Sequence, residues 1–135
     1  MGLAGAVRAI LDTSVLLASG EEGIPDLSGI DSKISSISIS EMQLGLVVSE
    51  GVERAVRATR LQRVMGIYGP GLAFDDSAAA SFGALTALVV ERGQSPRTAV
   101  LDRMIAATAH SLGVALVTRD KRLAVFEPAV TVVIR

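Results

Sequence analysis

Four acidic residues stand where an apolar stretch of this chain ends or a helix is expected to begin: Asp12, Glu41, Asp102 and Asp120. A carboxylate in apolar surroundings is unfavourable unless it is paired, hydrogen-bonded or bound to a metal. Carboxylates brought together also repel one another, by roughly 4 kcal/mol for a pair 4 Å apart at an effective dielectric constant of ~20. If the fold gathers these four side chains, a cation must balance their charge.

The cation that suits such a cluster is a hard divalent metal ion. No Lys or Arg is placed to serve all four carboxylates, and the lone histidine, His110, is too far along its helix from Asp102 to be its local partner. Mg²⁺ and Mn²⁺ prefer carboxylate oxygen, keep several waters and need no His or Cys ligand. Acids that hold one or two such ions commonly hydrolyse phosphodiesters, because one ion lowers the pKa of the attacking water and another stabilises the leaving oxygen.

A simpler structural role is open to three of the acids. Asp12 is a good N-cap for the short helix expected after it. The S-x-x-E motif that ends at Glu41 fits a capping box, and Asp120 fits a solvated turn. Asp102 is harder to explain in this way, because its polar neighbour Arg103 projects about 100° away around a helix.

The elements that must position these acids alternate between strands and helices. Strands are expected at 6–11, 34–37, 72–74, 114–118 and 130–134; helices at 14–19, 39–49, 52–66, from the caps at 75–77 to 92, and from 95–96 to 112; and a break at 20–25. Strands that are apolar throughout predict an α/β fold around a largely parallel sheet. Ligands of such sheets bind beyond the carboxyl ends of the strands, which is where Asp12 and Asp120 fall.

The composition narrows the function classes. At 135 residues, half of them hydrophobic and a fifth charged, the chain is most simply one domain, spanning 1–135. A net charge of -1 gives no global basic field, and 3% aromatic residues argue against a platform on which bases stack. With no cysteine and no apolar run long enough for a membrane span, we expect a soluble, cytoplasmic protein with no membrane partner.

Several motifs resemble a known family. Residues 10–16 (ILDTSVL), 39–41 (ISE), 101–109 (LDRMIAATA) and 116–120 (LVTRD) resemble the PIN-domain ribonucleases, most closely the VapC toxins of bacterial VapBC type II toxin–antitoxin systems. The resemblance implies a PIN-like, three-layer α/β/α sandwich with a mostly parallel central sheet. It also implies an endoribonuclease dependent on Mg²⁺ or Mn²⁺, with one or two ions in each active site, that acts as a toxin by inhibiting translation.

The resemblance also assigns roles and partners. It implies a catalytic and metal-binding quartet, and three residues that orient the carboxylates or their waters: Asp12, Glu41, Asp102 and Asp120, with Thr13, Ser14 and Thr118. Toxins of this kind are usually homodimers inhibited by a VapB-like antitoxin, so RNA, an antitoxin and a second copy are the expected partners. One departure is the lack of a further acid between Asp120 and Phe126, where many relatives carry one.

Four arginines recur every third residue in one expected helix: Arg54, Arg57, Arg60 and Arg63. At this spacing they cover a broad basic face, which fits binding to RNA phosphates or to an acidic part of an antitoxin. A solvated face balanced by Glu50 and Glu53 explains them as well.

Other classes fit the sequence less well. A phosphatase of the haloacid dehalogenase type needs a second Asp where Ser14 stands, a receiver domain needs a Lys where Thr118 and Arg119 stand, and a dinucleotide binder needs G-x-G-x-x-G after the first strand. The competing hypothesis is a PIN-like, non-catalytic scaffold that binds RNA or regulates. The presence of all four acids argues against it, because a scaffold does not need them.

Overall fold

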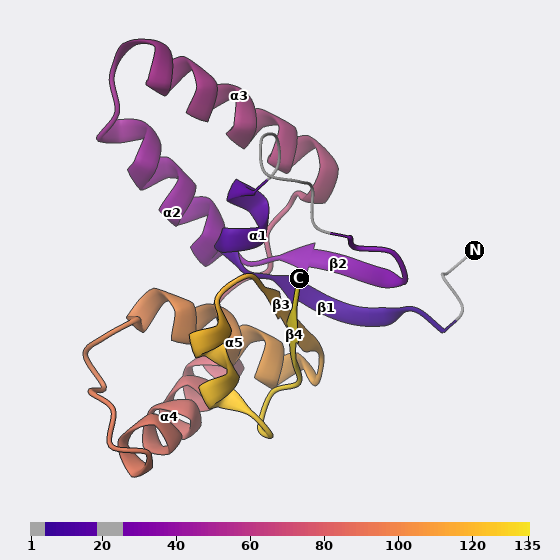
Figure 1. Cartoon of the computed structure of the whole chain (residues 1–135), viewed down its shortest axis with the longest axis vertical. Helices are drawn as coiled ribbons and strands as arrows, with labels where there is room; N and C mark the ends of the chain where they lie inside the picture. Colours follow the sequence, from indigo (N-terminus) through magenta and orange to yellow (C-terminus); the bar gives the residue numbers. More distant parts are fainter. Residues whose placement is uncertain (1–4, 19–25) are drawn as a thin grey trace.

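A parallel sheet forms the centre of the molecule. The structure, a computed structural model, describes residues 5–18 and 26–135, and the expected break at 20–25 lies outside them. Within this part of the chain the sheet has four strands in the order β2-β1-β3-β4 (Figure 1). They are β1 (Val7–Leu11), β2 (Ile30–Ile34), β3 (Ala115–Thr118) and β4 (Val132–Ile134). Every pairing is parallel, so all the carboxyl ends meet at one edge of the sheet.

Helices cover both faces of this sheet. They are α1 (Thr13–Leu17), α2 (Ser36–Val47), α3 (Gly51–Tyr68), α4 (Asp76–Glu91), α5 (Val100–Leu112) and the 3₁₀ helix η1 (Lys121–Phe126). Helices α1, α2 and α3 lie on one side of the strands, and α4, α5 and η1 lie on the other (Figure 1). The chain therefore folds as the three-layer α/β/α sandwich that the sequence motifs implied.

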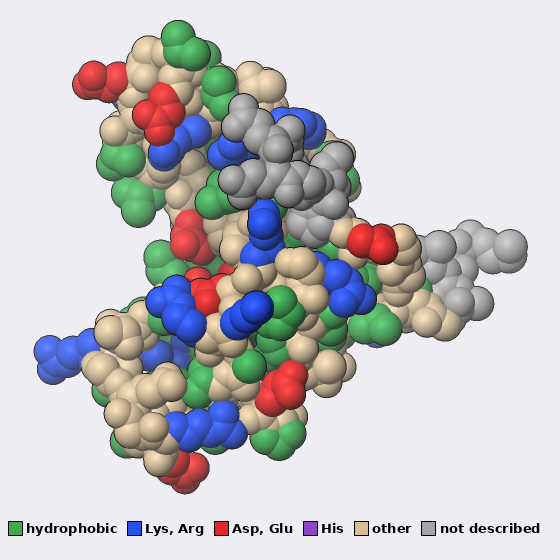
Figure 2. All heavy atoms as spheres, in the orientation of Figure 1, with side chains coloured by type: hydrophobic (Ala, Val, Ile, Leu, Met, Phe, Trp, Pro, Cys, Tyr) green, Lys and Arg blue, Asp and Glu red, His purple; other side chains and the backbone are tan. Residues whose placement is uncertain are grey.

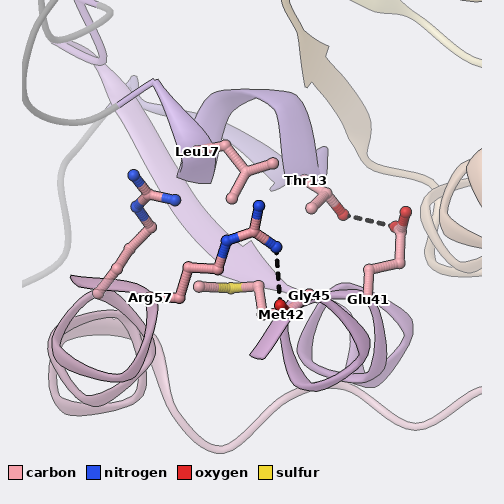
Figure 3. Close-up of a pocket in the computed structure, with 7 residues that line it drawn as sticks. Thr13, Leu17, Glu41, Met42, Gly45 and Arg57 are labelled. Atoms are coloured by element: carbon pink, nitrogen blue, oxygen red, sulfur yellow. Dashed lines mark hydrogen bonds between the residues drawn. The ribbon is translucent and has the colours of Figure 1, made fainter. Parts of the chain in front are cut away.

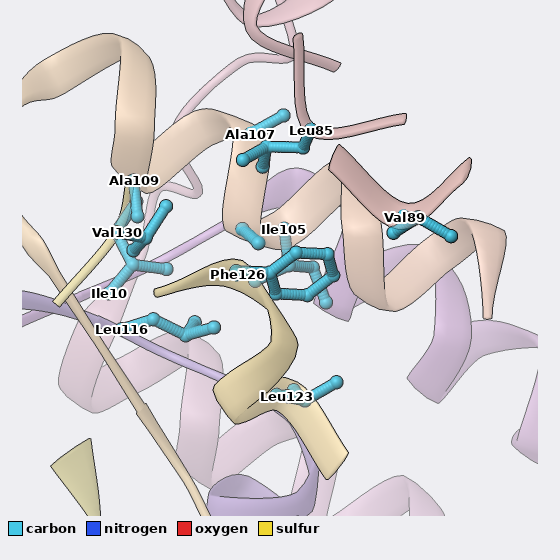
Figure 4. Packing of buried hydrophobic residues seen from close by; sticks show 11 residues of the cluster. Ile10, Leu85, Val89, Ile105, Ala107, Ala109, Leu116, Leu123, Phe126 and Val130 are labelled. Atoms are coloured by element: carbon cyan, nitrogen blue, oxygen red, sulfur yellow. The ribbon is translucent and has the colours of Figure 1, made fainter. Parts of the chain in front are cut away.

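The side chains of the central strands alternate between two hydrophobic cores. Ile10 and Leu116 pack with α4, α5 and η1 (Figure 4), whereas Leu11 and Val117 point to the opposite face and pack with α1, α2 and α3. This alternation follows from the period of two residues in a strand. Because both faces are covered, the two central strands are apolar along most of their length, which is why the sequence revealed them.

Several helix boundaries match those predicted from the sequence, and the ends of α4 show the reason. The Asp75 side chain accepts a hydrogen bond from the Ala78 amide (2.9 Å), as an N-cap should. After α4 and α5, Gly93 and Gly113 adopt φ of +76° and +66°, a left-handed conformation that favours glycine at a helix end. No helix in the described ranges is long and apolar enough to cross a membrane.

Other boundaries differ from the prediction. The second strand is 30–34, not 34–37, and the expected strand at 72–74 is reduced to a single bridge between Ser35 and Leu72. Helix α2 begins at Ser36, because the hydroxyl of Ser35 accepts from the Ile37 amide (3.0 Å) and caps the helix. Helix α5 begins at Val100 rather than at 95–96.

Candidate active site

Asp12 lies at the junction of β1 and α1, at the carboxyl edge of the sheet. It occupies the N-cap position of α1, but its side chain makes no capping hydrogen bond. Its residue is only 2% exposed, and its Oδ2 accepts hydrogen bonds from Ser14 Oγ (2.7 Å) and Thr118 Oγ1 (2.8 Å). The N-cap alternative for the Asp12 side chain is therefore contradicted, and the side chain points instead toward the end of β3.

The two hydroxyls that hold Asp12 are themselves held by the backbone. The amide of Asp120 donates to Thr118 Oγ1 (3.0 Å), and the amide of Arg119 donates to Ser14 Oγ (3.1 Å). Each hydroxyl thus accepts from the chain after β3 and donates to Asp12 Oδ2. The other oxygen, Oδ1, is buried and has no hydrogen-bond partner among the described residues.

Glu41 approaches Asp12 from α2. Thr13 Oγ1 donates a hydrogen bond to Glu41 Oε1 (2.7 Å; Figure 3) and also contacts the buried Ser38 hydroxyl at 2.8 Å. Burial raises the pKa of the Glu41 carboxyl, the Thr13 hydrogen bond opposes this, and the Asp12 carboxylate raises the pKa further. The expected capping box at Glu41 does not form, because Ser35 is the cap and Glu41 turns toward Thr13.

Asp102 lies in the first turn of α5, close enough to the other three acids for their negative charges to raise its pKa. Burial, followed by the charges of Asp12, Glu41 and Asp120, raises the pKa of Asp102 to about 6, and Arg122 partly opposes this. The fold thus brings the other three carboxylates close enough to Asp102 to interact with it electrostatically. Within the described residues, however, no three acidic or histidine side chains are arranged so that they could together hold a metal ion.

Asp120 has a cation of its own. The guanidinium of Arg122 lies against both carboxylate oxygens, with Nη2 2.6 Å from Oδ2 and Nε 3.0 Å from Oδ1. This pairing lowers the pKa of Asp120, which also caps η1 by accepting from the Arg122 amide (3.0 Å). Asp120 therefore has the turn role that was open to it, and its charge also acts on Asp102. Sequence reasoning missed Arg122, whose only signal was its position two residues after an N-cap aspartate.

The carboxyl groups of Asp12 and Asp102 suit a divalent metal ion. Mg²⁺ binds through one or two carboxylates and keeps several waters, so it does not require three acids in reach of one point. An unpartnered, buried carboxylate oxygen on Asp12 and a carboxyl on Asp102 whose pKa is raised by burial and by like charges both favour a bound cation. The residues present therefore suit Mg²⁺ or Mn²⁺ at Asp12 and Asp102.

The four arginines do not form one free basic face. Arg54 donates to the carbonyls of Ser49 and Val47, and Arg57 donates to Gly45 (2.7 Å; Figure 3) and pairs with Glu53, so both fasten α3 to the end of α2. Arg60 lines a cavity of about 190 Å³ with Thr13 and Glu41, and its Nε is buried without a partner in the described part of the chain. Arg63 is exposed.

His110 stands apart from the acids. Its Nδ1 lies 2.7 Å from the hydroxyl of Ser81, which joins α5 to α4.

The surface around the acids is hollowed. Figure 2 shows acidic side chains in the waist of the molecule, between the part that carries α2 and α3 and the part that carries α4 and α5, with Lys and Arg side chains around them. A cavity of about 600 Å³ lies in the part that carries α4 and α5, between η1 and the connection from α4 to α5, and Asp102 and Asp120 are among the residues that line it.

The family model described as the PIN domain matches residues 9–127, and the chain belongs to this family. Within the family it is similar to VapC proteins. It is 29% identical over 115 residues to ribonuclease VapC4 of Mycobacterium tuberculosis, covering 84% of this chain and 86% of the relative. Its fold matches the VapBC-5 toxin–antitoxin structure of the same species with a TM-score of 0.78 and 27% identity, over 96% of this chain and 99% of the other.

Other solved structures share the fold. FitAcB of Neisseria gonorrhoeae matches with a TM-score of 0.74 and 26% identity, over 93% of this chain and 96% of the other. VapBC2 of Rickettsia felis, bound to a DNA fragment from its promoter, matches with a TM-score of 0.75 and 19% identity, over 93% of this chain and 97% of the other, a likeness of fold alone. The resemblance to PIN-domain proteins of the VapC type is thus confirmed.

Proposed function

We propose that the chain, as a single domain, is an endoribonuclease that depends on Mg²⁺ or Mn²⁺ and hydrolyses RNA phosphodiester bonds. The observation that carries this proposal is the buried Oδ1 of Asp12, unpartnered among the described residues, in the same electrostatic neighbourhood as Glu41, Asp102 and Asp120. Membership of the PIN-domain family and similarity to a protein named as a ribonuclease support it.

Asp12 and Asp102 would hold the ion, and Glu41 and Asp120 would complete the site or hold its waters. When bound, the ion lowers the pKa of a coordinated water and polarises the scissile phosphate. The chain itself fixes the geometry, because the hydroxyls of Ser14 and Thr118 hold one oxygen of Asp12 and leave the other free.

We further propose that the protein is the toxin of a toxin–antitoxin pair, that it inhibits translation in the cytoplasm, and that it is a homodimer restrained by a VapB-like antitoxin. The names of the structural neighbours, several of which are toxin–antitoxin complexes, support this role. So do the apolar side chains around the turn between α2 and α3, where Val47, Val48 and Val52 are 70%, 69% and 81% exposed. An apolar patch of this kind marks a surface for a protein partner.

The test is cleavage of total RNA by the purified protein in Mg²⁺, in Mn²⁺ and in EDTA. We expect site-specific cleavage that needs the metal and is abolished by Asp12→Asn, which keeps the shape of the side chain but removes its charge. Asp31→Asn, at an exposed position of β2, is the matched control and should cleave normally.

The products give a second test. Attack by water in line with the leaving oxygen leaves a 5′-phosphate and a 3′-hydroxyl, whereas a 2′,3′-cyclic phosphate would show that the RNA supplies its own nucleophile. Metal-independent cleavage, or equal cleavage by Asp12→Asn, would contradict the proposed role of the acids. RNA binding without any cleavage would favour the non-catalytic scaffold.

A further inference from the structure

We propose that the cavity between η1 and the connection from α4 to α5 binds an unstacked nucleobase of the RNA, next to the phosphate that is cleaved. The inference rests on the proposed function and names a substrate subsite for it. Its support is the construction of the cavity, its continuity with the acids and one unsatisfied buried donor.

The cavity has the size and lining of a small-ligand site. Its volume of about 600 Å³ lies within the range of ~300–1,000 Å³ usual for such sites. Its apolar floor is formed by the buried side chains of Val89, Leu123 and Phe126, and Gln94 and Ser95 bring polar groups to its exposed rim. An apolar floor with polar groups at the rim suits a flat heterocycle, whose faces are apolar and whose edges form hydrogen bonds.

Arg103 makes one wall of this cavity rigid. The residue is 2% exposed, its guanidinium lies 4.8 Å from the ring centre of Phe82, and its terminal nitrogens donate to the carbonyls of Pro96 and Thr98. These bonds fasten the loop before α5. A further donor, Nε, is buried and has no partner among the described residues, so the N–H of Nε in this wall is left without an acceptor.

The cavity is continuous with the candidate active site. Asp102 and Asp120 line it, as does Arg122, whose side chain is 84% exposed. A guanidinium in this position can turn from Asp120 to an RNA phosphate. A phosphate held at the acids would therefore place an adjoining base at the mouth of the cavity.

The cavity also explains how a chain with few aromatic residues could select RNA. Single-stranded RNA is recognised through bases that are splayed out of the stack. Phe126 is only 2% exposed, so it serves as a floor rather than as a platform for stacking. Enclosure between the floor and the loop fastened by Arg103 takes the place of such a platform.

Binding is tested directly by NMR titration of the ¹⁵N-labelled protein with AMP, GMP, CMP and UMP in Mg²⁺. We expect at least one of them to shift the amide signals of residues 94, 95, 97–99 and 123–126, and ribose 5-phosphate to shift these signals much less. Equal shifts from ribose 5-phosphate would show a phosphate site alone and overturn the inference, as would nucleotide shifts confined to the cavity between α1, α2 and α3.

Two variants test the same cavity in cleavage of a single-stranded RNA. Val125→Trp fills it from the side of η1, and Gln94→Trp covers it from the exposed rim, where a fold defect is not expected. Leu112→Trp, at an exposed position outside the cavity, is the matched control. We expect kcat/KM to fall about tenfold in the first two variants, as for the loss of one bound base, and to stay unchanged in the control.

The outcomes separate this inference from the proposed function. If the wild-type protein cleaves RNA, but the cavity variants match Leu112→Trp and no nucleotide shifts the cavity amides, the subsite is wrong and the nuclease stands. If nucleotides shift these amides while no RNA is cleaved, the subsite stands and the nuclease is wrong.

Discussion

Replacing Asp102 by Asn should stabilise the metal-free protein while abolishing RNA cleavage. The pKa of Asp102 is raised from 3.8 to about 6 by burial and by the charges of three other acids. The folded state therefore disfavours its charged form. Asn keeps the shape of the side chain and removes that charge, and Asp102 has no side-chain hydrogen bond to the described residues that would be lost.

The size of the effect follows from the pKa. At about 1.4 kcal/mol per tenfold change, a pKa raised from 3.8 to about 6 corresponds to at most about 3 kcal/mol of lost stability. Asp102 is only partly buried, so solvent screening reduces this bound, and we expect the free energy of unfolding to rise by about 1–2 kcal/mol. This gain is roughly 3–8 °C in Tm for a domain of this size.

The stability difference between Asp102→Asn and wild type should increase as the pH rises. Because the folded pKa is raised, the unfavourable contribution of Asp102 is absent below pH 3.8, grows as the pH rises, and is complete above about pH 6. Urea unfolding in EDTA should therefore show a large difference between Asp102→Asn and wild type at pH 7.5 and a much smaller one at pH 4.5. Asp31→Asn should show little difference at either pH.

Added Mg²⁺ should make the wild-type protein more stable than Asp102→Asn, the reverse of the order expected in EDTA. Binding to the folded state stabilises the wild-type protein by mass action, and the variant should gain much less. If Asp102→Asn is no more stable than wild type in EDTA at pH 7.5, burial and the other carboxylates do not disfavour the charged form of Asp102 as described.

Four further substitutions test other contacts. Thr118→Val should lower the free energy of unfolding by about 1–2 kcal/mol in urea and also slow cleavage, because it removes a buried donor to Asp12; unchanged cleavage would show that this hydrogen bond does not position the acid. His110→Ala should leave the rate of RNA cleavage and its pH profile intact at the expense of about 1 kcal/mol of stability, whereas a lost pH-dependent step would assign the imidazole a catalytic role. Arg63→Ala should reduce the salt dependence of RNA affinity, with a slope smaller by about one, while Arg57→Ala should mainly lower Tm; the opposite pattern would reverse the roles assigned to these two arginines.

The central strands were predictable from sequence, whereas the edge strand β2 was not. Strands β1 and β3 are covered on both faces, so their sequences are mostly apolar and stand out. Strand β2, with the sequence IDSKI, lies at the edge of the sheet that the described residues form, and it exposes Asp31 and Lys33. Strand β2 is therefore determined by its backbone pairing with β1, which side-chain composition does not reveal.

The start of α2 was misplaced because serine caps are interchangeable in sequence. Serines stand at 35, 36, 38 and 40, and each can accept from an amide two or three residues later. Only the position of the chain after β2 selects Ser35. The capping box predicted at Glu41 fitted the motif equally well, but Thr13, distant in sequence, takes the Glu41 carboxylate.

The family resemblance indicated the hydroxyl residues that contact Asp12 and Glu41, whereas the partners of the arginines could not be read from the sequence. The pairing of Arg57 with the carbonyl of Gly45 depends on how α3 packs against α2, a tertiary contact that helical spacing does not contain. The same holds for Arg122, whose value as a partner depends on the turn that brings it back onto Asp120. Spacing alone assigned four arginines to one face, whereas packing gives them different roles.

The partners of the acids explain how the site can be ordered and still attract a cation. Neutral hydroxyls orient Asp12 and Glu41, and a neutral donor fixes a carboxylate without cancelling its charge. A Lys or Arg in the same place would order the side chain equally well, but would compete with a metal ion for it. Among the described residues, Asp120 alone of the four acids is paired with a cation in this way, and that cation, Arg122, is exposed and able to turn away. The negative charge around Asp102 is therefore largely retained in a fixed geometry, as a divalent ion requires.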